Sequence, residues 1–153
     1  MKELFDSLEH VDMETKGLKL LDTCFVFDLL SKQKKLPEGR YAITSFNVEE
    51  LLKVGHRLHK MKRGLRDFVK KNDLVVVEVP VHIGNFESEK AFVRSVDNEL
   101  LKLIPDASDA VLLTVAVKTK SSVYTKDKHH LFTVRLENYL AKYGIKVFKE
   151  IKG

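Results

Sequence analysis

The sequence contains little cysteine, proline or glycine. Of its 153 residues, one is cysteine (Cys24), three are proline and seven are glycine. A single cysteine excludes an intramolecular disulfide and a zinc site built from several thiolates, and it suits a reducing compartment. Because Pro and Gly are scarce and no low-complexity stretch is present, we expect the chain to fold without long linkers.

The sequence also lacks long apolar runs. None approaches the roughly 20 residues that a membrane-spanning helix needs, and charged residues stand near the N-terminus where a signal segment would be apolar. With 44% hydrophobic residues, the chain can still bury the core of one domain. We therefore expect a cytoplasmic protein with no membrane-embedded part.

Positive charge is in excess and is concentrated in one segment. The net charge is +5, which is compatible with a phosphate-bearing partner. Residues 53–71 carry eight Lys and Arg against one acid, at spacings that predict a basic helical face. Such a face is equally well explained as solvated surface. As RNA contacts within it we predict Arg57, Lys60, Lys62 and Arg63.

Apolar periodicity predicts alternating strands and helices. Strands are expected near 18–27, ending close to Asp22, and then at 41–44, 74–81, 121–125 and 145–148. Helices are expected over 1–16, over 48–69 as one helix or two, from 92 to 103, over 107–117 as a buried helix, and over 132–140. Asn47 is interpreted as the cap of the helix that follows it.

This alternation predicts an α/β fold. Parallel strands need crossover connections, so we expect a mostly parallel sheet of four or five strands with helices on both faces. Residues 1–17 are expected as an N-terminal helical extension and residues 18–153 as a single domain. In such folds ligands gather at the carboxyl ends of the strands.

Four acidic residues fall at this expected edge. Asp22 and Asp127 follow strands, whereas Glu50 and Asp109 lie early in helices. Crowded carboxylates raise one another's pKa and are tolerated chiefly when a cation neutralises them. An all-oxygen set favours Mg²⁺ or Mn²⁺ over zinc.

Each acid also has a purely structural explanation. Asp106 and Asp109 have the spacing of a helix start, and for Asp106 we prefer the role of cap. Asp127 is nearly as well explained as the cap of the next helix, and Glu50 as a solvent-facing residue. Asp22 is the exception, because an acid inside an apolar run is costly to bury without a partner.

Four blocks, in order, resemble the PIN-domain family between Leu18 and Leu131. The first is LLDTCFVFDLL around Asp22, in which Cys24 stands where the family usually has Ser. The second, TSFNVEELL, assigns Thr44 and Glu50, with Glu49 as the alternative. PDASDAVLLTVA assigns Asp109 with Asp106 beside it, and VYTKDKHHL assigns Thr125 and Asp127.

The resemblance implies a PIN-like, Mg²⁺- or Mn²⁺-dependent endoribonuclease. Its metal ligands and catalytic residues would be Asp22, Glu50, Asp109 and Asp127, around one ion or two. Thr23, Thr44, Thr125 and Asp106 would surround those ligands. The implied partners are RNA, an antitoxin or a processing-complex protein, and a second copy in a homodimer.

Two other functions compete with this one. A non-catalytic PIN-like module would bind RNA or a protein through the basic helix, with the acids serving only structure. A phosphate-accepting receiver or phosphatase is less favoured, because the residues after Asp22 read Thr-Cys-Phe and lack the second acid of such motifs.

Overall fold

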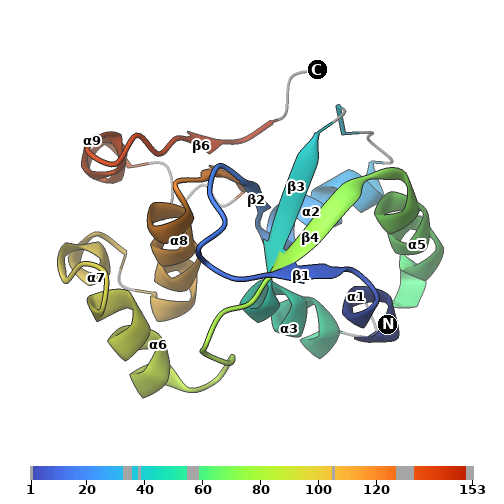
Figure 1. Ribbon diagram of the computed structural model, residues 1–153, viewed down its shortest axis with the longest axis horizontal. Helices are drawn as coiled ribbons and strands as arrows, with labels where there is room; N and C mark the ends of the chain where they lie inside the picture. Colours follow the sequence, from blue (N-terminus) through green and yellow to red (C-terminus); the bar gives the residue numbers. More distant parts are fainter. Residues whose placement is uncertain are drawn as a thin grey trace.

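The structure is a computed structural model that describes residues 2–32, 36–37, 39–54, 59–104, 106–126 and 133–150. Within them, six strands form one sheet in the order β1-β4-β3-β2-β5-β6, and every pairing is parallel (Figure 1). The strands are β1 Glu9–Val11, β2 Lys19–Leu21, β3 Arg40–Thr44, β4 Asp73–Val77, β5 Ser122–Tyr124 and β6 Val147–Phe148. The predicted α/β fold is confirmed, with one strand more than the upper expectation.

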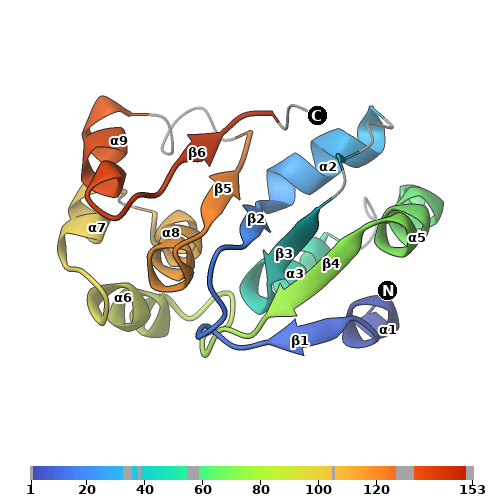
Figure 2. The same ribbon diagram turned by 45° about the horizontal axis from the view of Figure 1, so that its top comes forward.

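Helices cover both faces of this sheet. They are α1 Lys2–Asp6, α2 Thr23–Ser31, α3 Ser45–Lys53, α5 Lys62–Lys71, α6 Phe86–Arg94, α7 Glu99–Leu103, α8 Ala107–Thr119 and α9 Val134–Ala141. In Figure 2, α6 to α9 gather on one side and α1, α2 and α5 on the other. No helix of the described residues is long and apolar enough to cross a membrane.

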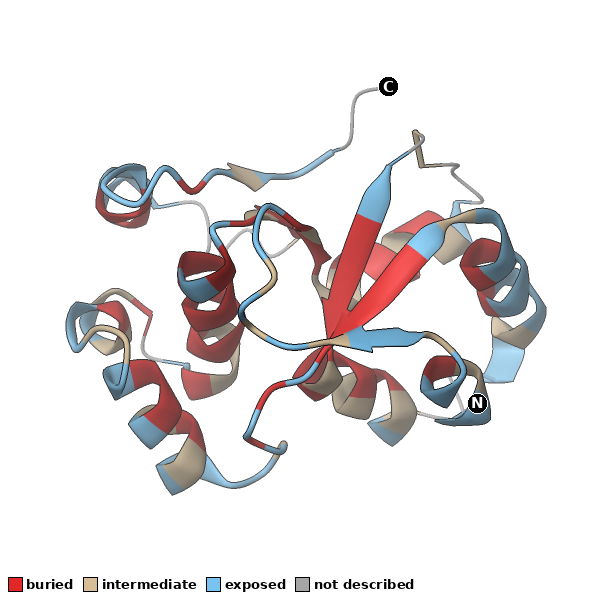
Figure 3. Ribbon diagram, in the orientation of Figure 1, coloured by how far each residue is buried: buried red, intermediate tan, exposed pale blue. Residues whose placement is uncertain are grey.

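Side-chain alternation along the strands builds a core on each face. Leu20 and Val75 belong to the cluster that packs against α6 to α9, whereas Leu21 and Val76 belong to the cluster under α1, α2, α3 and α5. Successive strand residues point to opposite faces, so a strand buried on both sides is apolar throughout. Figure 3 shows this as continuous burial along most of β3 and β4.

The buried helix expected over 107–117 is confirmed as α8. Its residues are buried along nearly the whole length, which explains the absence of an amphipathic pattern. Asp106 caps it as predicted, since its carboxylate accepts a hydrogen bond from the backbone nitrogen of Asp109 at 3.2 Å. Lys120 ends the helix in the left-handed conformation with φ 50°.

The N-terminal helix expected over residues 1–16 is wrong beyond Asp6. Glu9–Val11 is instead the edge strand β1, in register with Val75–Val77 of β4. The strand occupies backbone groups at the exposed edge of β4, for example where the nitrogen of Glu78 donates to the oxygen of Val11 at 2.8 Å. Residues 1–17 thus supply both a short helix and a strand of the main sheet.

Two other local predictions needed correction. Asn47 does not cap α3; Thr44 does, accepting a hydrogen bond from the nitrogen of Asn47 at 2.9 Å. The helical pattern over 92–103 belongs to two helices, α6 and α7, and the side chain of Asp97 accepts from the nitrogen of Glu99 between them. The helical pattern over 48–69 includes α3, which ends at Lys53, and α5, which begins at Lys62; residues 55–58 between them lie outside the described residues.

The topology defines where a crevice should form. From β2 the chain moves through β3 to β4 on one side, and it later returns to place β5 on the other side of β2. In open parallel sheets ligands bind at the carboxyl ends of the strands at such a reversal. The segments that follow β2, β3 and β5 therefore meet at the expected functional edge.

Candidate active site

Asp22 lies at the centre of this edge, between the end of β2 and the start of α2. Its Oδ1 accepts a hydrogen bond from the nitrogen of Thr23 at 2.8 Å, which makes Asp22 the N-cap of α2. Its Oδ2 accepts from the hydroxyl of Thr125 at 2.7 Å, directly after β5. The carboxylate is thus held by hydrogen bonds from two neighbouring strand ends.

Glu50 approaches Asp22 from α3. Its Oε1 accepts hydrogen bonds from Nδ2 of Asn47 at 2.8 Å and from the hydroxyl of Thr23 at 3.4 Å. Burial first, and then the neighbouring charge of Asp22, raise the pKa of Glu50 from 4.5 to about 7; Asp109 adds to the rise, and the two hydrogen bonds oppose it. The ionised form is therefore disfavoured here unless positive charge is nearby.

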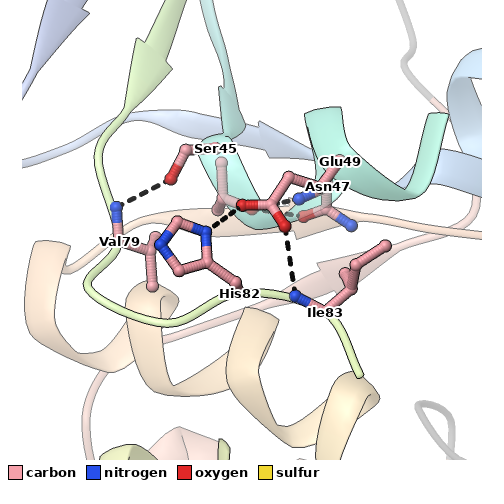
Figure 4. A network of polar contacts seen from close by, with 7 residues as sticks. Ser45, Asn47, Glu49, Val79, His82 and Ile83 are labelled. Carbon is pink, nitrogen blue, oxygen red and sulfur yellow. Dashed lines mark hydrogen bonds and ion pairs between the residues drawn. The ribbon is translucent and has the colours of Figure 1, made fainter. Parts of the chain in front are cut away.

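The adjacent Glu49 points elsewhere (Figure 4). Its carboxylate pairs with Nδ1 of His82 at 2.5 Å and accepts a hydrogen bond from the nitrogen of Ile83 at 3.2 Å. In the same segment, the nitrogen of Val79 donates to the hydroxyl of Ser45 at 2.8 Å. Glu49 thus tethers the chain that follows β4 to α3. Of the two alternatives that the sequence left open, the structure places Glu50 in the cleft.

The carboxylates share an open cleft of about 580 Å³. Asp109 lines it from the first turn of α8. Helix α8 packs on the opposite face of the sheet from α2 and α3. The cleft is lined by Asp22, Thr23, Cys24, Phe27, Asp28, Ser31, Glu50, Asp109 and Lys126. Lys126 is the cation among these lining residues, and its Nζ lies 3.6 Å from a carboxylate oxygen of Asp28. Three of the four predicted acids are therefore brought together, and Asp127 lies outside the described residues.

The acids fit a divalent cation that keeps several of its water ligands better than one whose ligands all come from the protein. No group of three His, Cys, Asp or Glu side chains in the described part of the chain is placed so that it could hold a metal ion jointly. Asp22 and Glu50 nevertheless both lie within hydrogen-bond range of one nitrogen, Nδ2 of Asn47. Mg²⁺ often keeps several waters and uses only one or two carboxylates, so this pair suits Mg²⁺ or Mn²⁺.

The residues predicted around the ligands have distinct places. Thr23 and Thr125 each donate a hydrogen bond to one of the acids. Thr44 is buried and caps α3 without contacting an acid in any hydrogen bond of the described residues. Asp106 caps α8 and does not line the cleft.

Sequence reasoning missed two residues whose side chains contact these acids, Asn47 and Cys24. Asn47 touches both acids through its side-chain amide, although its sequence context suggested only a helix cap. The thiol of Cys24 donates to Asp22 at 3.4 Å, and its sulfur accepts from the nitrogen of Lys126 at 3.3 Å. Burial and the charge of Asp22 raise the pKa of Cys24 to about 11, so the thiol stays neutral. In the sequence, Cys24 stood out only as a departure from the block that resembles the PIN-domain family.

The predicted basic surface is separate from this cleft. A groove of about 570 Å³ is lined by His59, Lys60, Lys62, Arg63, Arg66, Asp67 and Lys70. It shares no lining residue with the acidic cleft. The described residues contain no ion pair to Lys60, Lys62 or Arg63, and Arg57 lies outside them.

We compared the chain with protein-family models, curated proteins and solved structures, and none matched. The PIN-domain resemblance therefore remains a prediction from the four sequence blocks, and the function is argued from the site.

Proposed function

We propose that this protein is a divalent-metal-dependent endoribonuclease that hydrolyses phosphodiester bonds in RNA. One observation carries the proposal: Asp22, Glu50 and Asp109, from three separate elements, line one cleft at the carboxyl edge of a parallel sheet. Placing negative charges together in a partly buried cleft is unfavourable in isolation. A cation in this cleft would remove that penalty.

Each acid has a role in this chemistry. Asp22 and Glu50 would hold Mg²⁺ or Mn²⁺. Hydrogen bonds from Thr125, Thr23 and Asn47 orient the two carboxylates for this role. A divalent ion bound there would lower the pKa of a bound water and stabilise charge on the leaving oxygen. Asp109 would orient the attacking water from the α8 side of the cleft.

The basic groove supports RNA as the substrate class. Lys60, Lys62 and Arg63 line it together, and their positive charge attracts a polyanion irrespective of sequence. The groove lies largely along α5, outside the acidic cleft. RNA phosphates bound in this groove would therefore leave the acidic cleft open to the phosphodiester bond that is cleaved.

The test is cleavage of a mixed single-stranded and structured RNA pool with Mn²⁺, Mg²⁺ or EDTA. Asp22→Asn and Asp109→Asn are compared with Asp73→Asn, a matched change at an exposed position at the start of β4. Metal-dependent cleavage should be lost in the first two and kept in the third. Equal cleavage by all three variants would show that the nuclease is a contaminant.

A non-catalytic module is the second candidate. It is favoured by the basic groove and by the absence, within the described chain, of three residues placed to hold an ion jointly. RNA binding without cleavage under any divalent ion, unchanged in Asp22→Asn, would establish it. An antitoxin or processing-complex partner, a homodimer and a cytoplasmic location remain predictions; size-exclusion chromatography with light scattering tests the dimer.

A further inference from the structure

Asn47 is a buried polar residue next to the acidic cleft. It is the third residue of α3 and only 2% exposed. Its backbone nitrogen donates to the hydroxyl of Thr44 at 2.9 Å, and that hydroxyl lies 2.7 Å from Oδ1, the side-chain oxygen of Asn47. The residue is thus anchored on the side that faces the end of β3.

This anchoring decides which end of the amide faces the acids. The hydroxyl of Thr44 accepts from the nitrogen of Asn47 and donates its single hydrogen to Oδ1. Nδ2 is then turned toward the cleft. A flipped amide would put two acceptors, Oδ1 and the Glu50 carboxylate, against each other.

Nδ2 connects three groups from two elements. It lies 2.8 Å from Oε1 of Glu50, 3.1 Å from the hydroxyl of Thr23 and 3.4 Å from Oδ1 of Asp22. Two amide hydrogens serve these three acceptors, so at least one is shared. The shortest contact is to Glu50, three residues further along the same helix, where side chains lie on one face.

The hydrogen bonds to Glu50 converge on one of its two carboxylate oxygens. Hydrogen bonds from Asn47 and Thr23 both go to Oε1, and none in the described structure goes to Oε2. Because a carboxylate is planar, fixing Oε1 restricts where Oε2 can lie. The second oxygen, Oε2, accepts neither of these two hydrogen bonds.

We propose that Asn47 is a positioning residue for metal binding: its amide bridges Asp22 and Glu50 in the metal-free protein and presents Oε2 of Glu50 to the incoming ion. This inference rests on the proposed function, since it concerns the same cleft. A purely structural role for Asn47 would lower stability when it is replaced but would leave the metal affinity of the folded protein unchanged.

The test measures Mn²⁺ affinity directly, without RNA, from the electron paramagnetic resonance signal of free Mn²⁺. The samples are wild type, Asn47→Ala and the control Asn72→Ala, which removes an amide that donates to the oxygen of Phe68 at the end of α5. Loss of a residue that orients metal ligands typically weakens affinity by about 10- to 100-fold. We expect that loss for Asn47→Ala and none for Asn72→Ala.

Each outcome decides a different question. Equal affinity of wild type and folded Asn47→Ala, or an equal loss in Asn72→Ala, would overturn the positioning role and leave the nuclease proposal standing. No binding by wild type at millimolar Mn²⁺ would overturn both. If Asn47→Ala does not fold by circular dichroism, Asn47→Ser keeps a polar group at this position but removes the bridging amide, and the same criterion applies.

Discussion

Replacing Glu50 by Gln should stabilise the metal-free protein while removing the proposed metal-dependent cleavage of RNA. Burial and the charge of Asp22 raise the pKa of Glu50 from 4.5 to about 7. A rise of this size corresponds to about 3 kcal/mol in favour of the protonated form. Because Glu50 is only half-buried, solvent screening reduces the expected gain in unfolding free energy to about 1–2 kcal/mol at high pH. Gln keeps an oxygen for the hydrogen bonds from Asn47 and Thr23.

The gain should depend on pH in a defined direction. In the unfolded chain Glu50 loses its proton near pH 4.5, and in the folded protein near pH 7. Between these values the folded state binds more protons, so the contribution of Glu50 to wild-type stability falls as pH rises. Gln does not titrate. The advantage of Glu50→Gln should therefore be close to zero below about pH 4 and complete above about pH 8.

Urea denaturation in EDTA across this pH range measures the effect. Glu49→Gln is the matched control on the same helix; it weakens the pair with His82 and should destabilise the protein or leave its stability unchanged. The reasoning is refuted if Glu50→Gln is no more stable than wild type at high pH, or if its advantage is the same at all pH values. Mn²⁺ in place of EDTA should reduce the difference in unfolding free energy between Glu50→Gln and wild type, because a bound cation stabilises ionised Glu50.

Three further predictions follow from named contacts. Thr125→Val should lower the unfolding free energy by about 1–3 kcal/mol, because the buried hydroxyl that donates to Asp22 at 2.7 Å is lost; urea denaturation should show it, and an unchanged midpoint would contradict it. Asp106→Ala should cost about 1 kcal/mol through loss of the α8 cap while metal-dependent cleavage persists; loss of cleavage in folded protein would instead place Asp106 in the site. The double variant Lys62→Glu, Arg63→Glu should weaken RNA binding and reduce its dependence on salt concentration, because two cations that line the basic groove are lost. Fluorescence anisotropy at several salt concentrations measures this binding, and the affinity for Mn²⁺ should not change. An unchanged salt dependence would mean that the groove does not bind RNA.

Much of the fold could be predicted because its signals are local. The strand before Asp22 and the buried helix α8 were expected from uninterrupted apolar runs, and both are present. Strand β1 could not be predicted, since three residues at a sheet edge carry no periodic pattern of their own. The break between α6 and α7 was missed for a related reason: both helices place apolar residues in one core cluster, so helical spacing continues across the break.

The candidate site divides in the same way. Asp22 stood out because an acid inside an apolar run is costly to bury without a partner, whereas Asp109 also had the spacing of a helix start and was favoured through the family resemblance. Glu49 and Glu50 were nearly equivalent in the sequence, and only the opposite directions of their side chains separate them, one toward His82 and one into the cleft. The bridging role of Asn47 depends on a contact with Asp22, 25 positions away along the chain.

Local patterns in the sequence were thus enough to predict the class of fold and the types of residue at the ends of the strands. Hydrophobic alternation and the requirement for crossover connections are properties of short segments, and these favour a parallel sheet covered by helices. Only the tertiary arrangement shows that Asp22, Glu50 and Asp109 share one cleft, which oxygens of Asp22 and Glu50 accept hydrogen bonds, and that the basic groove lies apart from them. The physical reason is that strand order and helix packing set distances between residues far apart in the chain, and no local pattern contains those distances.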